Sequence, residues 1–223
     1  MSKSLIISTK SWNEKIIKDY IKLNPNFKYF NHIKKLKEYL KKNKPNKIFF
    51  IHFSQKVPLQ ITAKFECINF HMTDLPFGRG GSPLQNLIIR GFKKTILTAH
   101  TMTNKIDEGD IILKRSMSLK GSAKSIYIRS TKLSLRMIKY ISKNRIKSKK
   151  QIGKAVQFKR RNKDQSKLKL NNSLEYIYNF IRMLDAPGYP HAFINTKTKK
   201  VIFKNAKYNN KILTAKIQII NNE

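Results

Sequence analysis

Segments with strand spacing and segments with helix spacing alternate through the first part of the chain, and this alternation restricts the fold more than any other feature. The strand-like segments are compact and apolar, whereas the helix-like segments place apolar side chains along one face. In order they are a strand at 4–9, a helix at 11–23, a strand at 27–30, a helix at 32–42 and a strand at 47–53. This order predicts an α/β fold with a mostly parallel sheet, right-handed crossovers and helices on both faces.

In a sheet of this kind ligands bind at the carboxyl ends of the strands. That geometry places residues 53–58, His71 and the loop near Asp107 along one edge. The first strand is followed by Thr-Lys-Ser at 9–11, where a dinucleotide-binding chain needs the G-x-G-x-x-G turn. The sequence has no Walker loop either, so the pattern argues against nicotinamide-dependent and ATP-dependent enzymes.

The stretch from Cys67 to Leu113 holds the residues best suited to chemistry. Asn69 and His71 are two positions apart on a predicted strand, so their side chains leave the same face. Cys67 shares that face one step deeper, and we interpret it as a small core residue rather than a nucleophile.

A histidine after an apolar strand is, taken alone, more often a hydrogen-bonded structural residue than a catalyst. Here a rigid turn with Pro and Gly follows at 75–83, and Asp107 lies further on in a D-x-G turn. An amide, an imidazole and a carboxylate that converge on a strand-end cleft suit a reaction through a tetrahedral oxyanion.

The net charge of +36, from 48 Lys and Arg against 12 Asp and Glu, has two explanations. It could be a nucleic-acid footprint, because each neutralised phosphate releases counterions and adds affinity. The alternative is a lysine-biased genome, and we favour it because the excess is spread over the whole chain and not gathered on one face or stripe. In both cases the surface favours anionic partners.

Other global features bound the class of protein. The 223 residues are enough for one α/β domain with a small annex. We find no run of about 18 apolar residues and no cleavable leader, so we expect a cytoplasmic protein with no membrane insertion. The single cysteine excludes an internal disulfide and a multi-cysteine metal site.

The second half of the chain predicts further elements. These are a strand at 114–119, a long helix at 122–144, a basic loop at 143–154, a helix at 171–184 capped by Ser173, a hairpin at 192–205 and a strand at 213–220. We interpret the basic loop as a solvated linker, with a phosphate-binding patch as the minority view.

Three motifs occur in a defined order: N-x-H at 69–71, L-P-x-x-R-G at 75–80 and D-x-G at 107–109. Their order and spacing resemble the folate-dependent formyltransferases, a family that includes methionyl-tRNA formyltransferase and the sugar N-formyltransferases. The resemblance implies a Rossmann-like sheet, a 10-formyltetrahydrofolate donor, an amine acceptor, and Asn69, His71 and Asp107 as the catalytic trio.

Chemical roles for the trio follow from their functional groups. Asn69 can donate an amide N–H to the oxyanion that develops when an amine attacks a formyl carbon. His71 can supply a second donor or carry the proton, and Asp107 can orient His71 or take the proton directly. Three rival carboxylates are Asp74, Glu108 and Asp110; the family pattern favours Asp107.

The resemblance also implies a donor site beside the trio. The residues expected to contact the folate are Ser54, Gln55, Lys56, Val57, Pro58, Phe77, Gly78, Arg79, Gly80, Gly81 and Thr103. Family members usually have a longer, more apolar loop than the one at 54–58. Arg79 either meets an anionic part of a ligand or braces the turn.

Segments of the tail resemble the sugar N-formyltransferases in particular. They are F-x-R-R at 158–161, I-Y-N-F-I-R-x-L at 177–184 and P-G-Y-P-H-A-F at 187–193. In that group the equivalent region packs on the core and often contributes to dimerisation, so the resemblance allows a homodimer through the C-terminal region. We therefore predict a catalytic domain at 1–150 and a helix and β-hairpin extension at 151–223. Arg160 and Arg161 are either surface charge or contacts to substrate phosphates.

The acceptor expected from this likeness is a nucleotide-linked amino sugar used in surface polysaccharide biosynthesis. Methionyl-tRNA formyltransferases carry an additional C-terminal domain for which this sequence is short, and the tRNA alternative rests on the basic charge alone. A glycinamide ribonucleotide formyltransferase lacks the tail resemblance. A basic RNA-binding protein without catalysis would not need the trio.

Overall fold

The computed structural model describes residues 3–222, and the chain divides into two compact units. Unit 1 contains the chain up to Gly80 together with Ile96–Met117 and Ile128–Gln157. Unit 2 contains Gly81–Thr95, Ser118–Tyr127 and the chain from Phe158 onward. The predicted boundary between a catalytic domain and an extension at residue 150 stays a prediction.

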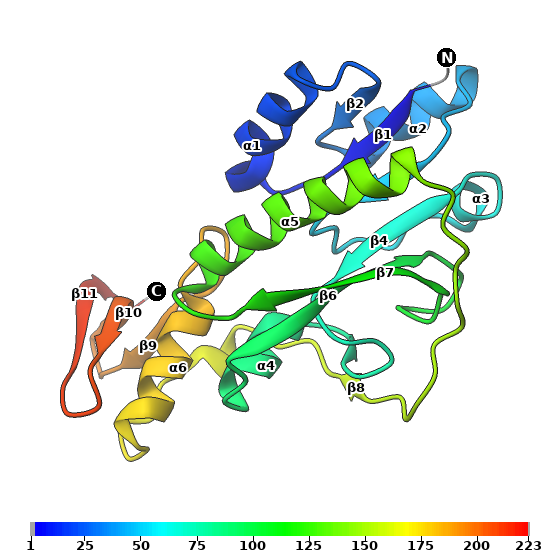
Figure 1. The fold of residues 1–223 in the computed structure, drawn as a ribbon. Helices are drawn as coiled ribbons and strands as arrows, with labels where there is room; N and C mark the ends of the chain where they lie inside the picture. The colour runs from blue at the N-terminus through cyan, green and yellow to red at the C-terminus, as the bar shows by residue number, and fades with distance from the viewer. Residues whose placement is uncertain (1–2, 223) are drawn as a thin grey trace. The chain divides into compact units, whose positions relative to one another are not determined.

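A six-stranded sheet forms the centre of unit 1 (Figure 1). Its strands are β1 (Ser4–Ile7), β2 (Phe27–Phe30), β3 (Ile48–Phe50), β4 (Cys67–His71), β6 (Lys94–Thr101) and β7 (Ile111–Ser118), in the order β2-β1-β3-β4-β6-β7. The pairs β1/β2, β1/β3 and β3/β4 are parallel, and β4/β6 is antiparallel. The predicted α/β fold with a mostly parallel sheet is therefore confirmed.

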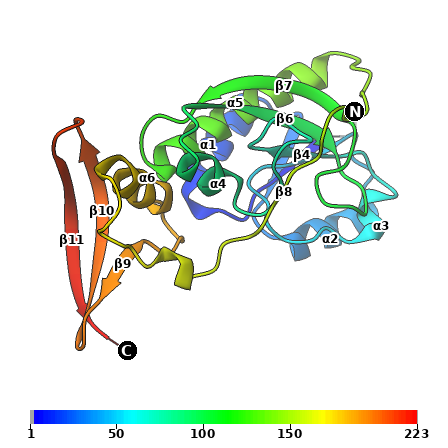
Figure 2. The same cartoon turned by 90° about the horizontal axis from the view of Figure 1, so that it is seen from below.

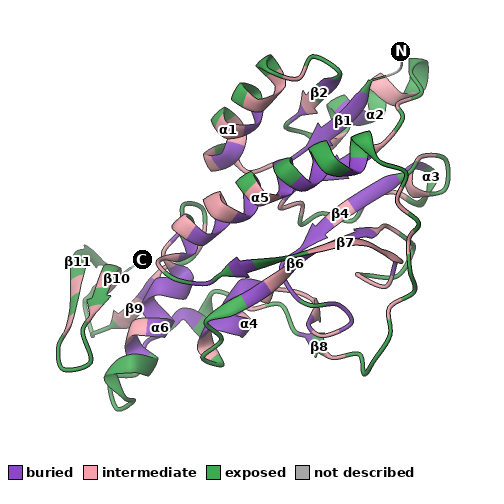
Figure 3. Ribbon diagram, viewed as in Figure 1, coloured by how far each residue is buried: buried purple, intermediate pink, exposed green. Residues whose placement is uncertain are grey.

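Helices cover both faces of this sheet, which is why its inner strands are continuous apolar runs. The helices are α1 (Ser11–Lys22), α2 (Ile33–Lys42), α3 (Leu59–Thr62) and α5 (Ala123–Lys143). Figure 2 shows α1 and α5 on one face and α2 and α3 on the other. In α5, Leu135 and Ile138 are buried while Arg136 and Lys139 are exposed, as Figure 3 shows for the helix as a whole. This amphipathic spacing fixes which side of α5 meets the core.

Several predicted strands have different bounds in the structure. The strand expected at 4–9 ends at Ile7, and the one expected at 213–220 extends to Asn221. The strand expected at 47–53 is limited to Ile48–Phe50, because the chain turns at His52, which has a left-handed φ of 48°. The strand expected at 114–119 begins earlier, at Ile111, which forms a bridge with Lys149. The short helix α3 was not expected.

Unit 2 contains α4 (Pro83–Ile89), α6 (Leu174–Leu184), the short 3-10 helix η1 (Asp164–Ser166) and an antiparallel sheet. The sheet has the order β11-β10-β9, with β9 at Ala192–Asn195, β10 at Lys199–Tyr208 and β11 at Leu213–Asn221. Ser173 caps α6 as predicted, because its side chain accepts a hydrogen bond from the Tyr176 N–H. The short strand β5 (Arg79–Gly80) belongs to unit 1 and pairs with β8 (Gln157–Phe158), which begins in the same unit.

Candidate active site

Strand β4 presents Asn69 and His71 from the same face, because alternate residues of a strand point the same way. Cys67, two positions earlier, is buried with apolar residues of β1, β3 and α2. Burial, with a smaller effect from Glu66, raises the pKa of the Cys67 thiol to about 12. The thiol therefore stays protonated and belongs to the core, as the sequence indicated.

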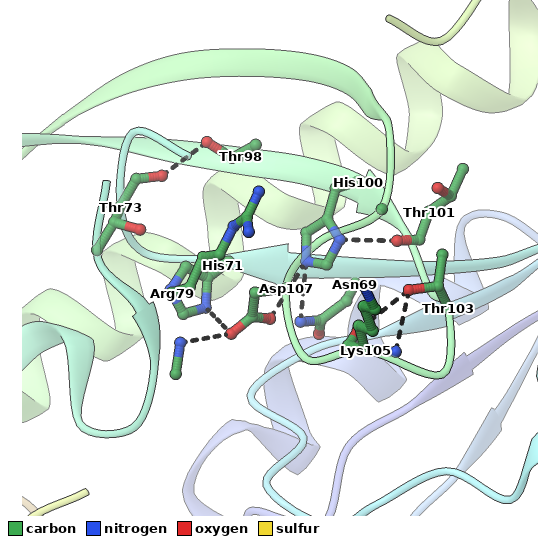
Figure 4. Close-up of polar contacts among 12 residues, drawn as sticks. Asn69, His71, Thr73, Arg79, Thr98, His100, Thr101, Thr103, Lys105 and Asp107 are labelled. Atoms are coloured by element: carbon green, nitrogen blue, oxygen red, sulfur yellow. Dashed lines mark hydrogen bonds and ion pairs between the residues drawn. The ribbon is translucent and has the colours of Figure 1, made fainter. Parts of the chain in front are cut away.

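Asp107 lies between two histidines (Figure 4). Its Oδ2 is 3.5 Å from His71 Nδ1 and its Oδ1 is 3.4 Å from His100 Nε2. The Gly80 N–H donates to Oδ2 at 2.9 Å. The loop that carries Asp107 thus reaches back to β4, and the predicted carboxylate and imidazole are brought together.

His100 is a member of the site that the sequence did not predict. The antiparallel pairing of β4 and β6 sets His100 opposite Asn69, and Asn69 Nδ2 is 3.4 Å from His100 Nε2. His100 Nδ1 lies 2.7 Å from the Thr101 carbonyl oxygen, which can only accept, so Nδ1 donates there. The other ring nitrogen of His100 therefore faces Asn69 and Asp107.

The orientation of His71 is set in the same way. Its Nε2 is 2.7 Å from the Gly78 carbonyl oxygen, so Nε2 carries a hydrogen and donates it. In the neutral ring the lone pair is then on Nδ1, on the side of Asp107. His71 is therefore arranged to accept a proton at Nδ1 and to hold it against a carboxylate.

Asn69, His71, His100 and Asp107 form a cluster whose electrostatics act in opposite ways on His71 and Asp107. Burial raises the pKa of Asp107, but the His100 side chain, the positive charge that both histidines can carry and the Gly80 N–H outweigh it and lower that pKa to about 2. Burial lowers the pKa of His71, against the opposing effects of Asp107 and the Gly78 carbonyl. At neutral pH the site thus holds a carboxylate and an imidazole able to take a proton.

The three rival carboxylates have other surroundings. Asp74 is exposed and pairs with Lys114. Glu108 Oε1 is 3.3 Å from Arg79 Nη1, and the Asp110 carbonyl accepts the Thr101 N–H. Of these four acids, the aspartate of the D-x-G turn is the one that contacts the histidines.

The turn expected to contact the folate also contacts His71 and Asp107 through its backbone. The Gly78 carbonyl and the Gly80 N–H are already engaged by the site. Arg79 donates from Nε and Nη2 to Gln151 Oε1, at 3.1 and 2.8 Å, and pairs with Glu108. These contacts are of the bracing kind, and contact of Arg79 with an anionic part of a ligand stays a prediction.

The other residues predicted for the folate site have varied environments. Ser54, Gln55 and Lys56 are exposed, Pro58 and Phe77 are half-buried, and Val57 packs in the apolar core below α2 and α3. The Thr103 hydroxyl is used inside its own turn, donating to the Lys105 carbonyl and accepting the Lys105 N–H. Contact of these residues with a folate stays a prediction.

Gly81, Arg160 and Arg161 belong to unit 2. A Cβ at Gly81 would lie 2.6 Å from the Arg160 Cα, so glycine there permits a close backbone approach. The Arg161 N–H donates to Ser82 Oγ, and its guanidinium lies 5.6 Å from the centre of the Phe180 ring. Arg161 thus has structural contacts, while the Arg160 side chain is exposed.

Unit 1 contains a cavity of about 640 Å³. Its lining includes Lys47, Glu66 and the segment 141–148, but none of Asn69, His71 and Asp107. Within residues 3–222, no group of three or more His, Cys, Asp or Glu side chains is arranged to hold a metal ion. Across the same residues, no helix is both long and apolar enough to span a bilayer.

Two family profiles match the chain in separate segments. The profile described as Formyl transferase matches residues 6–134, which is more than half of the chain. The profile described as Methionyl-tRNA formyltransferase, C-terminal domain, matches residues 163–220. The first match contains all four residues of the cluster.

Curated relatives match the chain over part of their own length. A methionyl-tRNA formyltransferase of Clostridium beijerinckii is 30% identical over 172 residues, which are 74% of this chain and 55% of the relative. The bifunctional polymyxin resistance protein ArnA of Wigglesworthia glossinidia brevipalpis is 33% identical over 214 residues, which are 90% of this chain and 31% of the relative. The chain thus spans about half the length of the first of these relatives and a third of the second.

Two solved structures match the chain over all or nearly all of its length. A methionyl-tRNA formyltransferase from Clostridium thermocellum is 41% identical, has a TM-score of 0.95 and is matched over 100% of both chains. A sugar N-formyltransferase from a Shewanella species shares the fold, with a TM-score of 0.69 and 19% identity over 95% of this chain and 100% of its own. With the profile match and the arrangement of Asn69, His71 and Asp107, these comparisons show that the chain belongs to the formyltransferase family.

Proposed function

We propose that this chain is an N-formyltransferase that moves the formyl group of 10-formyltetrahydrofolate to the amine of a nucleotide-linked amino sugar, in surface polysaccharide biosynthesis. The proposal of formyl transfer is supported by the cluster of Asn69, His71, His100 and Asp107. Asp107 lies within 3.5 Å of His71, and Asn69 approaches His100 at 3.4 Å. The folate supplies an activated formyl carbon. The protein has to stabilise charge on the formyl oxygen and remove one proton from the amine.

Asn69 is suited to the formyl oxygen. Its amide nitrogen carries two hydrogens, one of which is directed at His100. Among the described residues the second has no partner, and the side chain is only half-buried, so it can donate to an oxygen that gains negative charge. A fixed amide donor of this kind stabilises the transition state more than the ground state.

His71 is suited to the proton. The attacking amine becomes an ammonium and must lose a proton, and Nδ1 of the neutral His71 ring is the available base. The Asp107 carboxylate stabilises the imidazolium that forms. His100 acts as a positioning residue, because its Nε2 contacts both Asn69 and Asp107.

The residues present fit a folate donor beside the cluster. The polar side chains of Ser54, Gln55 and Lys56 are exposed, so they are available to a polar pterin ring. The loop at 103–107 ends in Asp107 itself, so a donor held there places its one-carbon group near the cluster. In this proposal Phe77, which is half-buried, and the turn that follows it close the site.

The choice of a sugar acceptor is supported by the fold that the chain shares with the Shewanella sugar N-formyltransferase across 95% of its residues. Methionyl-tRNA is the second candidate, because the Clostridium thermocellum structure is 41% identical over the whole chain and the net charge is +36. Cytoplasmic location and a homodimer through the C-terminal region remain parts of the proposal.

A panel of acceptors tests the proposal. The purified chain is incubated with 10-formyltetrahydrofolate and nucleotide-linked 3-amino and 4-amino deoxysugars, initiator methionyl-tRNA or glycinamide ribonucleotide. We expect one of the sugars to gain the mass of a formyl group. The methionyl-tRNA and the glycinamide ribonucleotide should remain unchanged. Formylation of the tRNA alone would replace the sugar by the second candidate, and absence of any product would reject formyl transfer.

A substitution of His71 tests its proposed role as the base. His71→Ala should lower kcat/KM by about 100- to 10,000-fold, the usual contribution of a general base. The matched control is His32→Asn, at an exposed cap of α2 where asparagine can accept the same hydrogen bond from the Lys34 N–H. Full activity of His71→Ala in a folded protein would remove His71 from the mechanism.

A further inference from the structure

The backbone of Asp107 needs an external restraint. Its φ is 55°, in the left-handed region, which costs a residue other than glycine about 1–2 kcal/mol. Asparagine and aspartate tolerate this region better than most residues, but they do not impose it. The carboxylate can reach both histidines only while the loop keeps this conformation.

Gln151 supplies a restraint of this kind. Its Nε2 donates to the carbonyl oxygens of Asp107 and Gly109, each at 2.8 Å, so one amide group holds the loop on both sides of Glu108. The opposite side of the loop is fixed by Thr101, because a Cβ at Gly109 would lie 1.8 Å from the Thr101 carbonyl oxygen. The D-x-G turn is therefore held between Gln151 and β6.

Arg79 in turn fixes the direction of the Gln151 amide. The guanidinium can only donate and the two loop carbonyls can only accept, so Oε1 must face Arg79 and Nε2 must face the loop. Both hydrogens and both acceptor positions of the amide are then used. Arg79 is itself held by Glu108, which lies inside the loop that Gln151 grips.

We propose that Gln151, oriented by Arg79, is a positioning residue that holds the Asp107 carboxylate between His71 and His100. This inference rests on the proposed formyl transfer, since it assigns Gln151 an effect on that reaction. It extends the site to the segment after α5, which none of the sequence motifs reaches. Gln151 touches neither the donor nor the acceptor and acts only through Asp107.

Two variants separate the donor function from the shape of the side chain. Gln151→Glu keeps the shape and the contact with Arg79 but removes both N–H donors and sets an oxygen against the loop carbonyls. Gln151→Met removes every hydrogen bond without adding charge. Gln157→Glu and Gln157→Met are the matched controls, because Gln157 is exposed and lies in the same segment.

We expect both Gln151 variants to lower kcat by about 10- to 100-fold, the scale of a displacement of about 1 Å in a catalytic group. KM for the donor and the acceptor should stay within about threefold, because no binding contact is lost. The Gln157 controls should behave as wild type. Unchanged kcat in both Gln151 variants, or a loss that comes with raised KM and a lower unfolding midpoint, would overturn the inference.

A second measurement does not depend on activity. The pKa of His71 is followed from its imidazole Cε1–H resonance, assigned by its absence in His71→Ala. The groups that face His71 are Asp107, His100 and the Gly78 carbonyl, and of these Asp107 is the charge that Gln151 controls. Gln151→Met should lower the pKa of His71, because the carboxylate that raises it moves away.

The titration also distinguishes failure of the proposed formyl transfer from failure of the positioning role of Gln151. If wild type formylates no acceptor but Gln151→Met lowers the pKa of His71, the proposed function fails and the positioning of Asp107 by Gln151 stands. If wild type is active and neither kcat nor the pKa of His71 responds to Gln151, the positioning role fails and formyl transfer stands.

Discussion

His71 must be neutral to act as the base, and the charge state of this one residue should set how the reaction depends on pH. Burial lowers the pKa of His71 below its ordinary value of about 6.5. The protonated form cannot accept the amine proton, so kcat/KM should fall on the acid side, with the midpoint of that fall below the ordinary histidine pKa of about 6.5. A kcat/KM profile between about pH 4 and 8 measures this limb.

The variant Asp107→Asn tests what sets the pH at which the acid limb of the kcat/KM profile lies. The Asp107 carboxylate raises the pKa of His71, so its removal should move the acid limb to lower pH. The plateau should also fall, because the imidazolium formed during reaction loses its counter-charge. An acid limb that moves to higher pH, or stays in place with an unchanged plateau, would contradict the assigned roles.

At the scale of residues the sequence predicted three of the four groups in the cluster. Asn69 and His71 follow from period-two spacing on one strand, and Asp107 follows from its D-x-G turn and the family resemblance. His100 was missed because it enters through the antiparallel register of β4 and β6, which apolar patterning does not specify. Gln151 lies outside every motif, and only the folded loop reveals its two partners.

Among the elements, α6 shows most clearly that a helical sequence pattern does not predict contacts with other elements. The periodicity of 171–184 predicted its apolar face, and Ser173 was recognised as the cap. An arginine in such a pattern is expected on the polar face, yet Arg182 is only 6% exposed. Its Nη1 donates to the carbonyls of Leu119 and Gly121 at 2.7 and 2.9 Å. The sequence pattern of α6 cannot predict these contacts, because both partners lie outside the helix.

Arg182 should therefore stabilise unit 2 strongly. Arg182→Met keeps much of the apolar length but removes the charged donor, and it leaves two carbonyls without their partner. We expect a loss of about 2–4 kcal/mol in the free energy of unfolding, since hydrogen bonds to charged groups contribute about 1.5–3 kcal/mol. Urea unfolding of the variant and wild type measures the difference.

The control for Arg182→Met is Arg136→Met in α5, where the arginine is exposed. A surface substitution of this kind should change the free energy of unfolding by less than about 0.5 kcal/mol. Equal effects of the two substitutions would mean that the contacts of Arg182 do not hold α6 in place.

The whole molecule carries a charge of +36 and has a pI of about 10.4, and charges of one sign repel one another more strongly in a compact chain than in an unfolded one. The excess is distributed over both units, as the even spread of lysine in the sequence implies. Specific pairs such as Lys93 with Glu175 and Lys114 with Asp74 engage only a few of the 48 cations. Self-repulsion should therefore lower the stability of the fold at low ionic strength.

Sodium chloride should accordingly raise the thermal stability of the protein. Between about 10 mM and 150 mM the Debye length falls from about 30 Å to about 8 Å, which screens repulsion between distant charges. We expect the unfolding midpoint to rise by about 2–4 °C for each kcal/mol of repulsion removed, as measured by circular dichroism at pH 7. The rise should shrink near pH 10.4, the pI, where the net charge vanishes. A midpoint that does not respond to salt would show that self-repulsion does not limit stability. A rise that is equally large near the pI would show instead that salt acts through burial of apolar surface.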